Sequence, residues 1–137
     1  MKGRRQTSHA RLYHLARTAD RASIQRAGLQ MSHGWDSGTG CYLTTNPGSW
    51  LFLYTENRYD DEAAEIADTY TTAVDIWEVD VTGYRLVADR HETADPKEDF
   101  VVRQNVPPER LKLIRSLVMR GLKKDRRGRF FYDWKDA

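Results

Sequence analysis

Only one cysteine, Cys41, and four prolines occur among the 137 residues of this sequence. A single cysteine excludes an intrachain disulfide framework and a zinc site with several cysteine ligands. No apolar run approaches the roughly 20 residues that a membrane-spanning helix needs. Residues 1–11 are basic but lack the apolar stretch of a secretory signal. These absences favour a cytoplasmic protein of one ordinary domain that makes no membrane contact. Cys41 alternates with Tyr42 in the sequence, which favours a buried and unreactive thiol.

Several well-known catalytic motifs are also missing. No phosphate-binding loop occurs, and the glycines of residues 34–40 precede a predicted strand instead of following one, unlike a dinucleotide-binding turn. No serine lies in the sharp turn that exposes a hydrolase nucleophile. The histidines lack the spacing that metal ligands need, so we expect no metal site. They are His9, His14, His33 and His91.

The formal net charge of +2 hides an uneven distribution. Residues 1–17 carry five basic groups and no acid, and residues 119–137 carry seven basic groups against three acids. Between them, residues 18–118 carry ten basic groups and 17 acids. The last segment also holds four aromatic residues. This composition is compatible with nucleic-acid contact, where cations follow phosphates and aromatic rings stack on bases. We expect the macromolecular partner at the basic ends.

The first half of the chain predicts alternating strands and helices. In chain order we expect a strand over 12–16, a helix over 21–27, a strand over 41–44, a helix that begins at Asn46-Pro47 and a helix over 62–67. Thr18 or Asp20 is suited to cap the first helix, and Gly28 is suited to end it in a left-handed conformation.

The second half predicts mainly strands. They cover residues 74–81, 100–102 and 111–114, and Pro107-Pro108 separates the last two because proline cannot donate to a ladder. In the first of them, Trp77, Val79 and Val81 alternate with acids, which predicts one apolar face and one acidic face.

This order favours a single small α+β domain with largely antiparallel strands. We expect residues 1–10 to form a basic N-terminal arm. Residues 115–137 form a basic, aromatic C-terminal extension, which we expect to dock on the domain because so many of its residues are apolar.

One ordered set of residues suits a particular chemistry. It comprises His14 in the first predicted strand, Tyr42 in the second, Tyr54 in the next helix, and the acids Glu98 and Asp99 before a late strand. A histidine can hydrogen-bond a ribose hydroxyl, and two tyrosine rings can enclose a flat ring between them. A carboxylate near the ribose can stabilise oxocarbenium charge and activate a nucleophile. Cleavage of the nicotinamide–ribose bond of NAD needs these groups.

The segments that hold these residues resemble the ADP-ribosyltransferase superfamily, in its diphtheria-toxin-like and poly(ADP-ribose)-polymerase-like branch with a His–Tyr–Glu signature. Residues 12–16 resemble the family's first strand, which usually reads hydrophobic–aromatic–His–Gly–Ser/Thr. Residues 40–44 resemble its Gly-x-Tyr-Phe/Leu-Ala/Thr strand, and residues 98–102 resemble the Glu-Tyr-Val-Val strand whose glutamate is catalytic. Residues 23–29 resemble its Ile-x-x-x-Gly-Leu helix end, and residues 107–111 resemble the Ile-Pro-Pro-Glu-x-Ile ending of small bacterial and phage relatives.

The resemblance implies split antiparallel β-sheets with short flanking helices, and NAD as co-substrate. His14 would hold the nicotinamide ribose, and Tyr42 and Tyr54 would flank the nicotinamide ring. Asp99 or Glu98 would be the catalytic acid. The further positions implied at the NAD site are Leu15 and Thr44, beside the motif histidine and tyrosine, and Arg11, Arg17 or Arg103, which would face the pyrophosphate.

Two departures from the family pattern leave other functions open. Leu15 stands where the family usually has glycine, and Asp99 instead of Glu98 precedes the aromatic residue. They motivate an alternative, a catalytically degenerate module of the same fold that binds nucleic acid or a protein partner. A lesser alternative is an RNA 2′-phosphotransferase-like enzyme, which calls for several basic residues along a phosphate pocket. The acceptor, protein or nucleic acid, stays open, and a toxin, a viral effector and a housekeeping enzyme all suit the pattern.

Overall fold

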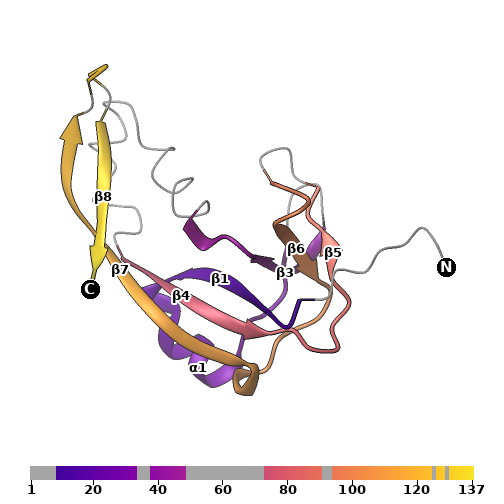
Figure 1. The fold of residues 1–137 in the computed structure, drawn as a ribbon. Coiled ribbons are helices and arrows are strands. Elements are labelled where there is room, and N and C mark those ends of the chain that lie inside the picture. Colours follow the sequence, from indigo (N-terminus) through magenta and orange to yellow (C-terminus); the bar gives the residue numbers. More distant parts are fainter. Residues whose placement is uncertain (1–8, 34–37, 49–72, 91–93, 125, 129) are drawn as a thin grey trace.

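The computed structural model describes residues 9–33, 38–48, 73–90, 94–124, 126–128 and 130–137 (Figure 1). The strands are β1 (Arg11–Arg17), β2 (Ser32–His33), β3 (Thr39–Thr44), β4 (Ala73–Asp80), β5 (Val87–Ala88), β6 (Asp99–Val102), β7 (Leu111–Lys124) and β8 (Phe130–Asp136). The helices are α1 (Arg21–Ala27) and two 3₁₀ helices, η1 (Thr18–Asp20) and η3 (Pro108–Arg110). No helix in these ranges is long and apolar enough to cross a membrane.

The strands form an antiparallel sheet in the order β5-β6-β3-β1-β4-β7-β8, with the short β2 beside β3 (Figure 1). The predicted strands are confirmed, and the last of them continues to Lys124. The α+β prediction holds only in its coarse form, because the described part has one short α-helix and is mostly β. The helices predicted from Asn46-Pro47 onwards and over residues 62–67 fall largely or wholly outside the described residues.

Pairing along the sheet is uneven. β1 is in register with β4 at all seven of its residues, from Arg11 opposite Asp80 to Arg17 opposite Val74. β4 is in register with β7 over a similar length, with one irregularity. β1 and β3, in contrast, share a single register pair, Tyr13 opposite Thr44. The sheet therefore has a continuous half, β1-β4-β7, and a second half, β3-β6-β5, which joins the first through one residue pair.

The two faces of the sheet carry separate apolar clusters. On one face, the first cluster includes Leu12, Leu43, Trp77 and Phe100, together with Ile24 of α1. On the other face, the second cluster consists of Leu15, Val74, Ile76 and Leu117, with Tyr13 and Trp134 packed against it. Successive strand residues point to opposite faces. His14 therefore projects toward the first face, and Tyr13 and Leu15 project toward the second.

The end of α1 is fixed by the close approach of another backbone segment. Gly28 has φ +77°, and a Cβ atom there would lie 2.0 Å from the carbonyl oxygen of Val106. Leu29 and Val106 exchange backbone hydrogen bonds of 2.8 and 2.9 Å directly beside this contact. Glycine is required here because any side chain would collide with this bridge. The prediction that Gly28 ends the helix with a positive φ is confirmed.

The cap predicted at the start of α1 is wrong. Asp20 occupies the cap position but makes no side-chain cap bond. Its carboxylate accepts from Arg17 instead, at 3.0 and 3.1 Å. The Thr18 hydroxyl donates to Asp75 of β4 at 2.8 Å. Both side chains bind a charged group and not the backbone N–H groups at the start of α1, because hydrogen bonds to charged groups are stronger than those to a neutral backbone donor.

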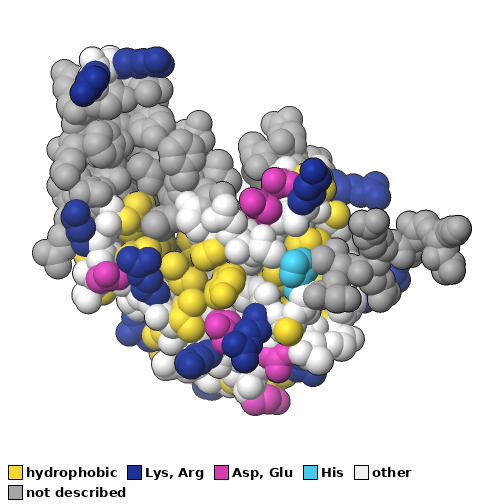
Figure 2. Space-filling model, viewed as in Figure 1, with side chains coloured by type: hydrophobic (Ala, Val, Ile, Leu, Met, Phe, Trp, Pro, Cys, Tyr) yellow, Lys and Arg dark blue, Asp and Glu magenta, His cyan; other side chains and the backbone are white. Residues whose placement is uncertain are grey.

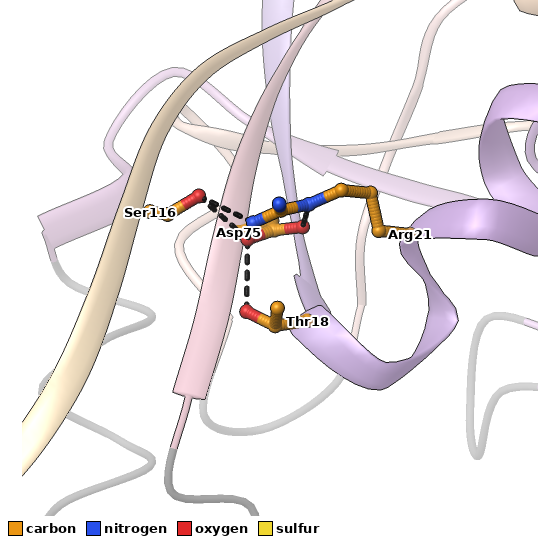
Figure 3. A network of polar contacts seen from close by, with 4 residues as sticks. All are labelled: Thr18, Arg21, Asp75 and Ser116. Atoms are coloured by element: carbon orange, nitrogen blue, oxygen red, sulfur yellow. Dashed lines mark hydrogen bonds and ion pairs between the residues drawn. The ribbon is translucent and has the colours of Figure 1, made fainter. Parts of the chain in front are cut away.

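Asp75 is the centre of a polar network that joins α1 to β4 and β7 (Figure 3). Arg21 donates to both carboxylate oxygens at 2.8 Å, and Thr18 and Ser116 each donate at 2.8 Å. Burial raises the pKa of Asp75, but these hydrogen bonds outweigh that effect and hold it below its ordinary value. Asp75 is fully buried, and its odd position puts it on the same face of β4 as Trp77 and Val79 and not on the face of Glu78 and Asp80.

The C-terminal extension joins the same sheet. Residues 115–118 belong to β7 and pair with β4, and β8 pairs with β7 from Leu117 opposite Asp136 to Lys124 opposite Phe130. Trp134 packs against the second apolar cluster. The extension is therefore docked by strand pairing, with an aromatic side chain in the core.

Candidate functional site

Three segments that carry the family-like motifs are neighbours in the sheet. The strand with His14, β1, lies beside the strand with Tyr42, β3, which lies beside β6, the strand that begins at Asp99. Just over 50 residues of sequence separate the second motif from the third, yet β3 and β6 are in register at four residue pairs. The fold therefore assembles the motifs into one continuous strip, β1-β3-β6.

His14 bridges the place where β1 and β3 share only one register pair. Its Nδ1 lies 2.9 Å from the Tyr42 carbonyl oxygen. Because a carbonyl only accepts, Nδ1 carries the proton and donates. Burial lowers the pKa of His14, partly opposed by this backbone hydrogen bond. The imidazole is therefore neutral at pH 7, and Nε2 is the nitrogen with a lone pair.

Tyr42 lies on the second face of the sheet, opposite Val101 of β6. Its hydroxyl donates to the Gly38 carbonyl oxygen. Desolvation raises the pKa of Tyr42, and the charge of Asp89 raises it further, while Arg103 opposes both. Arg103 donates to the Thr39 carbonyl at 3.0 Å, so its guanidinium lies against β3 near the tyrosine. Tyr42 thus lies near a carboxylate and a guanidinium group that act on its pKa in opposite directions.

Of the two predicted acids, Asp99 shares a face with Tyr42 and Glu98 does not. Asp99 is the first residue of β6 and lies opposite Thr44, two positions from Tyr42 on the same strand. Glu98 precedes the strand and has the opposite parity, and its carbonyl accepts from the Thr45 backbone at 2.8 Å. Alternation therefore assigns Asp99 to the site face.

Asp99 is held tightly by local backbone groups. It is 6% exposed, and its Oδ2 accepts from the Asp95 backbone N–H at 2.9 Å. The neighbouring Thr44 is fully buried, and its hydroxyl accepts from the Asn46 N–H at 3.0 Å. The bond from the Asp95 backbone therefore fixes the Asp99 carboxylate at the beginning of β6 and orients it.

Asp89 belongs to this site and was missed from the sequence. It follows β5, is 6% exposed, and donates its backbone N–H to the Asp99 carbonyl at 2.9 Å. Because β5 and β6 are antiparallel neighbours, Asp89 continues their register opposite Asp99 and shares its face. In the sequence, Asp89 is only an acid that follows a short apolar run, and this pattern is too common to identify a site residue.

Other predicted site residues lie elsewhere or are not described. Leu15 is buried in the second apolar cluster, so its side chain packs against Ile76 and its neighbours. Arg17 is engaged by Asp20 at the far end of β1, and Arg11 pairs with Glu78 at 3.7 Å. Tyr54 lies outside the described residues. Arg103 is therefore the predicted cation that the fold places beside Tyr42.

Cys41 is unsuited to chemistry in this strip. Its side chain is buried in the first apolar cluster, and desolvation raises its pKa to about 11. A thiol with such a pKa is protonated at pH 7 and is a poor nucleophile. Within the described ranges no group of three or more His, Cys, Asp and Glu side chains could hold a metal ion. The predicted inert cysteine is consistent with these contacts.

The chain matches no family model, no curated protein and no solved structure. The strip β1-β3-β6 offers a neutral imidazole on one face of the sheet and, on the other face, an aromatic ring with a guanidinium beside it and two buried carboxylates. Such a set can accept hydrogen bonds from sugar hydroxyls, pack against a flat ring and stabilise positive charge.

Proposed function

We propose that the chain is an NAD-dependent ADP-ribosyltransferase, which breaks the nicotinamide–ribose bond and transfers ADP-ribose to a macromolecular acceptor. The adjacency of β1, β3 and β6 carries this proposal. A chance likeness of three short segments gives no reason for them to be neighbours in one sheet. The single register pair between β1 and β3 also agrees with the split sheet that the resemblance implies.

His14 suits the sugar of NAD. Its Nδ1–H is used by the Tyr42 carbonyl, so the ring orientation and tautomer are fixed before a ligand arrives. In this tautomer Nε2 can accept a hydrogen bond from a ribose hydroxyl. Tyr42 follows on the next strand with its side chain on the other face, so NAD would contact both residues only across the gap where β1 and β3 share one register pair. There Tyr42 would pack its ring against the nicotinamide, and Arg103 would face the pyrophosphate.

Asp99 is the residue to which we give the charge-stabilising role. As the bond between ribose C1′ and the nicotinamide nitrogen breaks, its electron pair leaves with nicotinamide, and positive charge develops on the ribose. A carboxylate held by the Asp95 backbone stabilises that charge without having to reorganise. The acceptor's oxygen or nitrogen then attacks C1′ and releases its proton to a carboxylate or to solvent.

Release of labelled nicotinamide from NAD tests the proposal directly. Asp99→Asn keeps the size of the side chain and removes its charge, so nicotinamide release should fall at least about 100-fold. Glu98→Gln removes the adjacent charge on the other face and decides which acid acts. Asp20→Asn, an exposed change at the start of α1, should leave the rate within about twofold.

The rates of nicotinamide release distinguish Asp99 from Glu98 and test the transferase proposal itself. Loss of release in Asp99→Asn with native-like folding supports the assignment of Asp99. A larger loss in Glu98→Gln would transfer the role to Glu98. If the wild-type protein neither binds NAD in calorimetry nor releases nicotinamide with protein, DNA or RNA as acceptors, the transferase proposal is wrong.

A second candidate is a binding module of the same fold without catalysis. The observation that favours it is the confinement of Asp99, which is 6% exposed with one oxygen already bound by the Asp95 backbone. Such a module would bind NAD or its partner without bond cleavage. Tight NAD binding together with a nicotinamide release rate equal to that of Asp99→Asn would establish this alternative.

A further inference from the structure

The hairpin of β7 and β8 extends past the strand that anchors it. Among the described residues, β7 pairs with β4 only as far as Val118, opposite Ala73. Its pairing with β8 continues to Lys124, opposite Phe130. At about 3.3 Å per residue, the ribbon from Val118 to Lys124 is about 20 Å long. Figure 1 shows this ribbon at the opposite end of the sheet from β5 and β6.

The ribbon is strongly basic. Residues 119–130 contain six lysines and arginines and one acid. At its turn Arg126 and Arg127 are both exposed. Figure 2 shows dark blue Lys and Arg side chains at this tip of the molecule. The proposed site, in contrast, holds the buried acids Asp89 and Asp99. The cation-rich surface is therefore separate from the chemistry.

A two-stranded ribbon with a cationic turn has the dimensions and charge that the major groove of B-form DNA accepts. That groove is about 12 Å wide and admits an α-helix or a two-stranded ribbon. The deep, narrow major groove of A-form RNA does not admit side chains in this way. The register irregularity between Arg120 and Leu122 adds local twist, as bulges do.

Trp134, the aromatic residue of β8 whose side chain is described, does not offer a surface on which a base could stack. Proteins that bind single strands present aromatic rings on which bases stack. Trp134 is instead packed against the second apolar cluster with Leu15 and Leu117. Its ring therefore supports the hairpin from within and is not a stacking platform.

We propose that the β7–β8 ribbon docks on duplex DNA, with Arg126 and Arg127 contacting its phosphates. Resting on the proposed function, this inference makes duplex DNA the acceptor class of the transferase. The docking itself needs neither NAD nor Asp99, so it can be tested without catalysis.

Fluorescence anisotropy with a labelled 20-base-pair duplex, without NAD, measures the docking. The affinity should fall with salt, and the slope of log affinity against log salt should be less steep by about 2 in Arg126→Ala/Arg127→Ala, because each phosphate contact contributes about 0.9. The matched control is Arg26→Ala/Arg85→Ala, which removes the same charge from two exposed arginines outside the ribbon. It should leave the slope unchanged.

Three further arms make the outcome decisive. A single strand of the same sequence and an RNA duplex should each bind at least about tenfold more weakly than the DNA duplex. Asp99→Asn should bind duplex DNA like the wild type, which keeps a failure of the transferase proposal apart from a failure of docking. Equal slope changes in the ribbon variant and the control, preference for single strands or RNA, or no duplex binding would each overturn the docking proposal.

Discussion

The central strand β1 is paired to different extents with the two halves of the sheet. Toward β4 every residue of β1 has a register partner, and β4 is paired in turn with β7. Toward β3 a single pair is in register, and the His14 side chain bonds the Tyr42 carbonyl beside it. The residues that suit a ligand lie on the loosely joined side. A fully paired ladder has no main-chain capacity left for a ligand, so function is expected where the ladder ends.

Buried acids show the same contrast. Asp75, in the continuous half, is fully buried and neutralised by Arg21, with Thr18 and Ser116 as further donors. Asp99, in the other half, accepts from the Asp95 backbone N–H. The first arrangement fixes three elements to one another and satisfies its charge. The second holds a carboxylate at the beginning of β6 by a backbone donor.

The largest expected effect on stability comes from Asp75. Asp75→Asn removes the counter-charge of Arg21, whose side chain is 37% exposed. Breaking this partly buried ion pair should lower the free energy of unfolding by about 2 kcal/mol, less than for a fully buried pair because water screens the arginine. Urea denaturation measures it. Asp20→Asn breaks the exposed pair with Arg17 and should change stability by about 0.5 kcal/mol or less. Similar losses in both variants would show that burial does not set the contribution of Asp75 to stability.

A smaller effect is expected from Tyr42. Tyr42→Phe removes the hydroxyl that donates to the Gly38 carbonyl, and it should lower stability by about 1 kcal/mol. Tyr13→Phe removes the same atom from a half-buried ring on β1 and is the matched control. If Tyr42→Phe proved as damaging as Asp75→Asn, the strip β1-β3-β6 would be as essential to the fold as the continuous half.

The smallest expected effect is the pH dependence contributed by His14. Burial lowers the pKa of His14, so below about pH 6.5 the unfolded chain takes up a proton that the native ring does not. The unfolded state then binds more protons, and the free energy of unfolding decreases as the pH falls from about 6.5 toward the native pKa. Above that window both states are neutral, and this contribution is constant.

His14→Gln isolates this contribution. The glutamine amide can still donate to the Tyr42 carbonyl but cannot titrate, so the decrease in stability below pH 6.5 should become shallower. Denaturation at pH 7.5 and 5.5 gives the comparison, and the difference between the variants should itself change between the two pH values. A difference that is constant with pH would show that folding does not change the pKa of His14.

Sequence reasoning located the main strands because their apolar, β-branched residues are local signals. It placed the end of α1 at Gly28 for the same reason, since a positive φ strongly favours glycine. It failed at Asp20, whose carboxylate is taken by Arg17 three residues away. It also failed at Thr18 and did not reveal the network of Asp75, because the partners of these two residues are distant in the chain. Thr18 and Asp75 are 57 residues apart, so no local pattern reveals their hydrogen bond.

The candidate site divides in the same way. His14, Tyr42 and the acid pair are recognisable because each lies in a short motif. Which acid belongs to the site depends on the β3–β6 register, where Thr44 lies opposite Asp99. Asp89 could be assigned to the candidate site only from the structure, because the pairing of β5 with β6 places it opposite Asp99. Arg17 and Arg103 look equivalent as basic residues, but an ion pair engages the first, and the sheet places the second beside Tyr42.

The sequence by itself determined the strands of this protein, the glycine that ends its helix and the residue types available for chemistry. These follow from local conformational preference and from alternation along a strand. Only the tertiary structure decided that β1 is fully paired on one side and barely paired on the other, and that the basic C-terminal segment extends the sheet as a ribbon. Register and strand order depend on contacts between residues far apart in the chain, and the buried charges are resolved only when those contacts form.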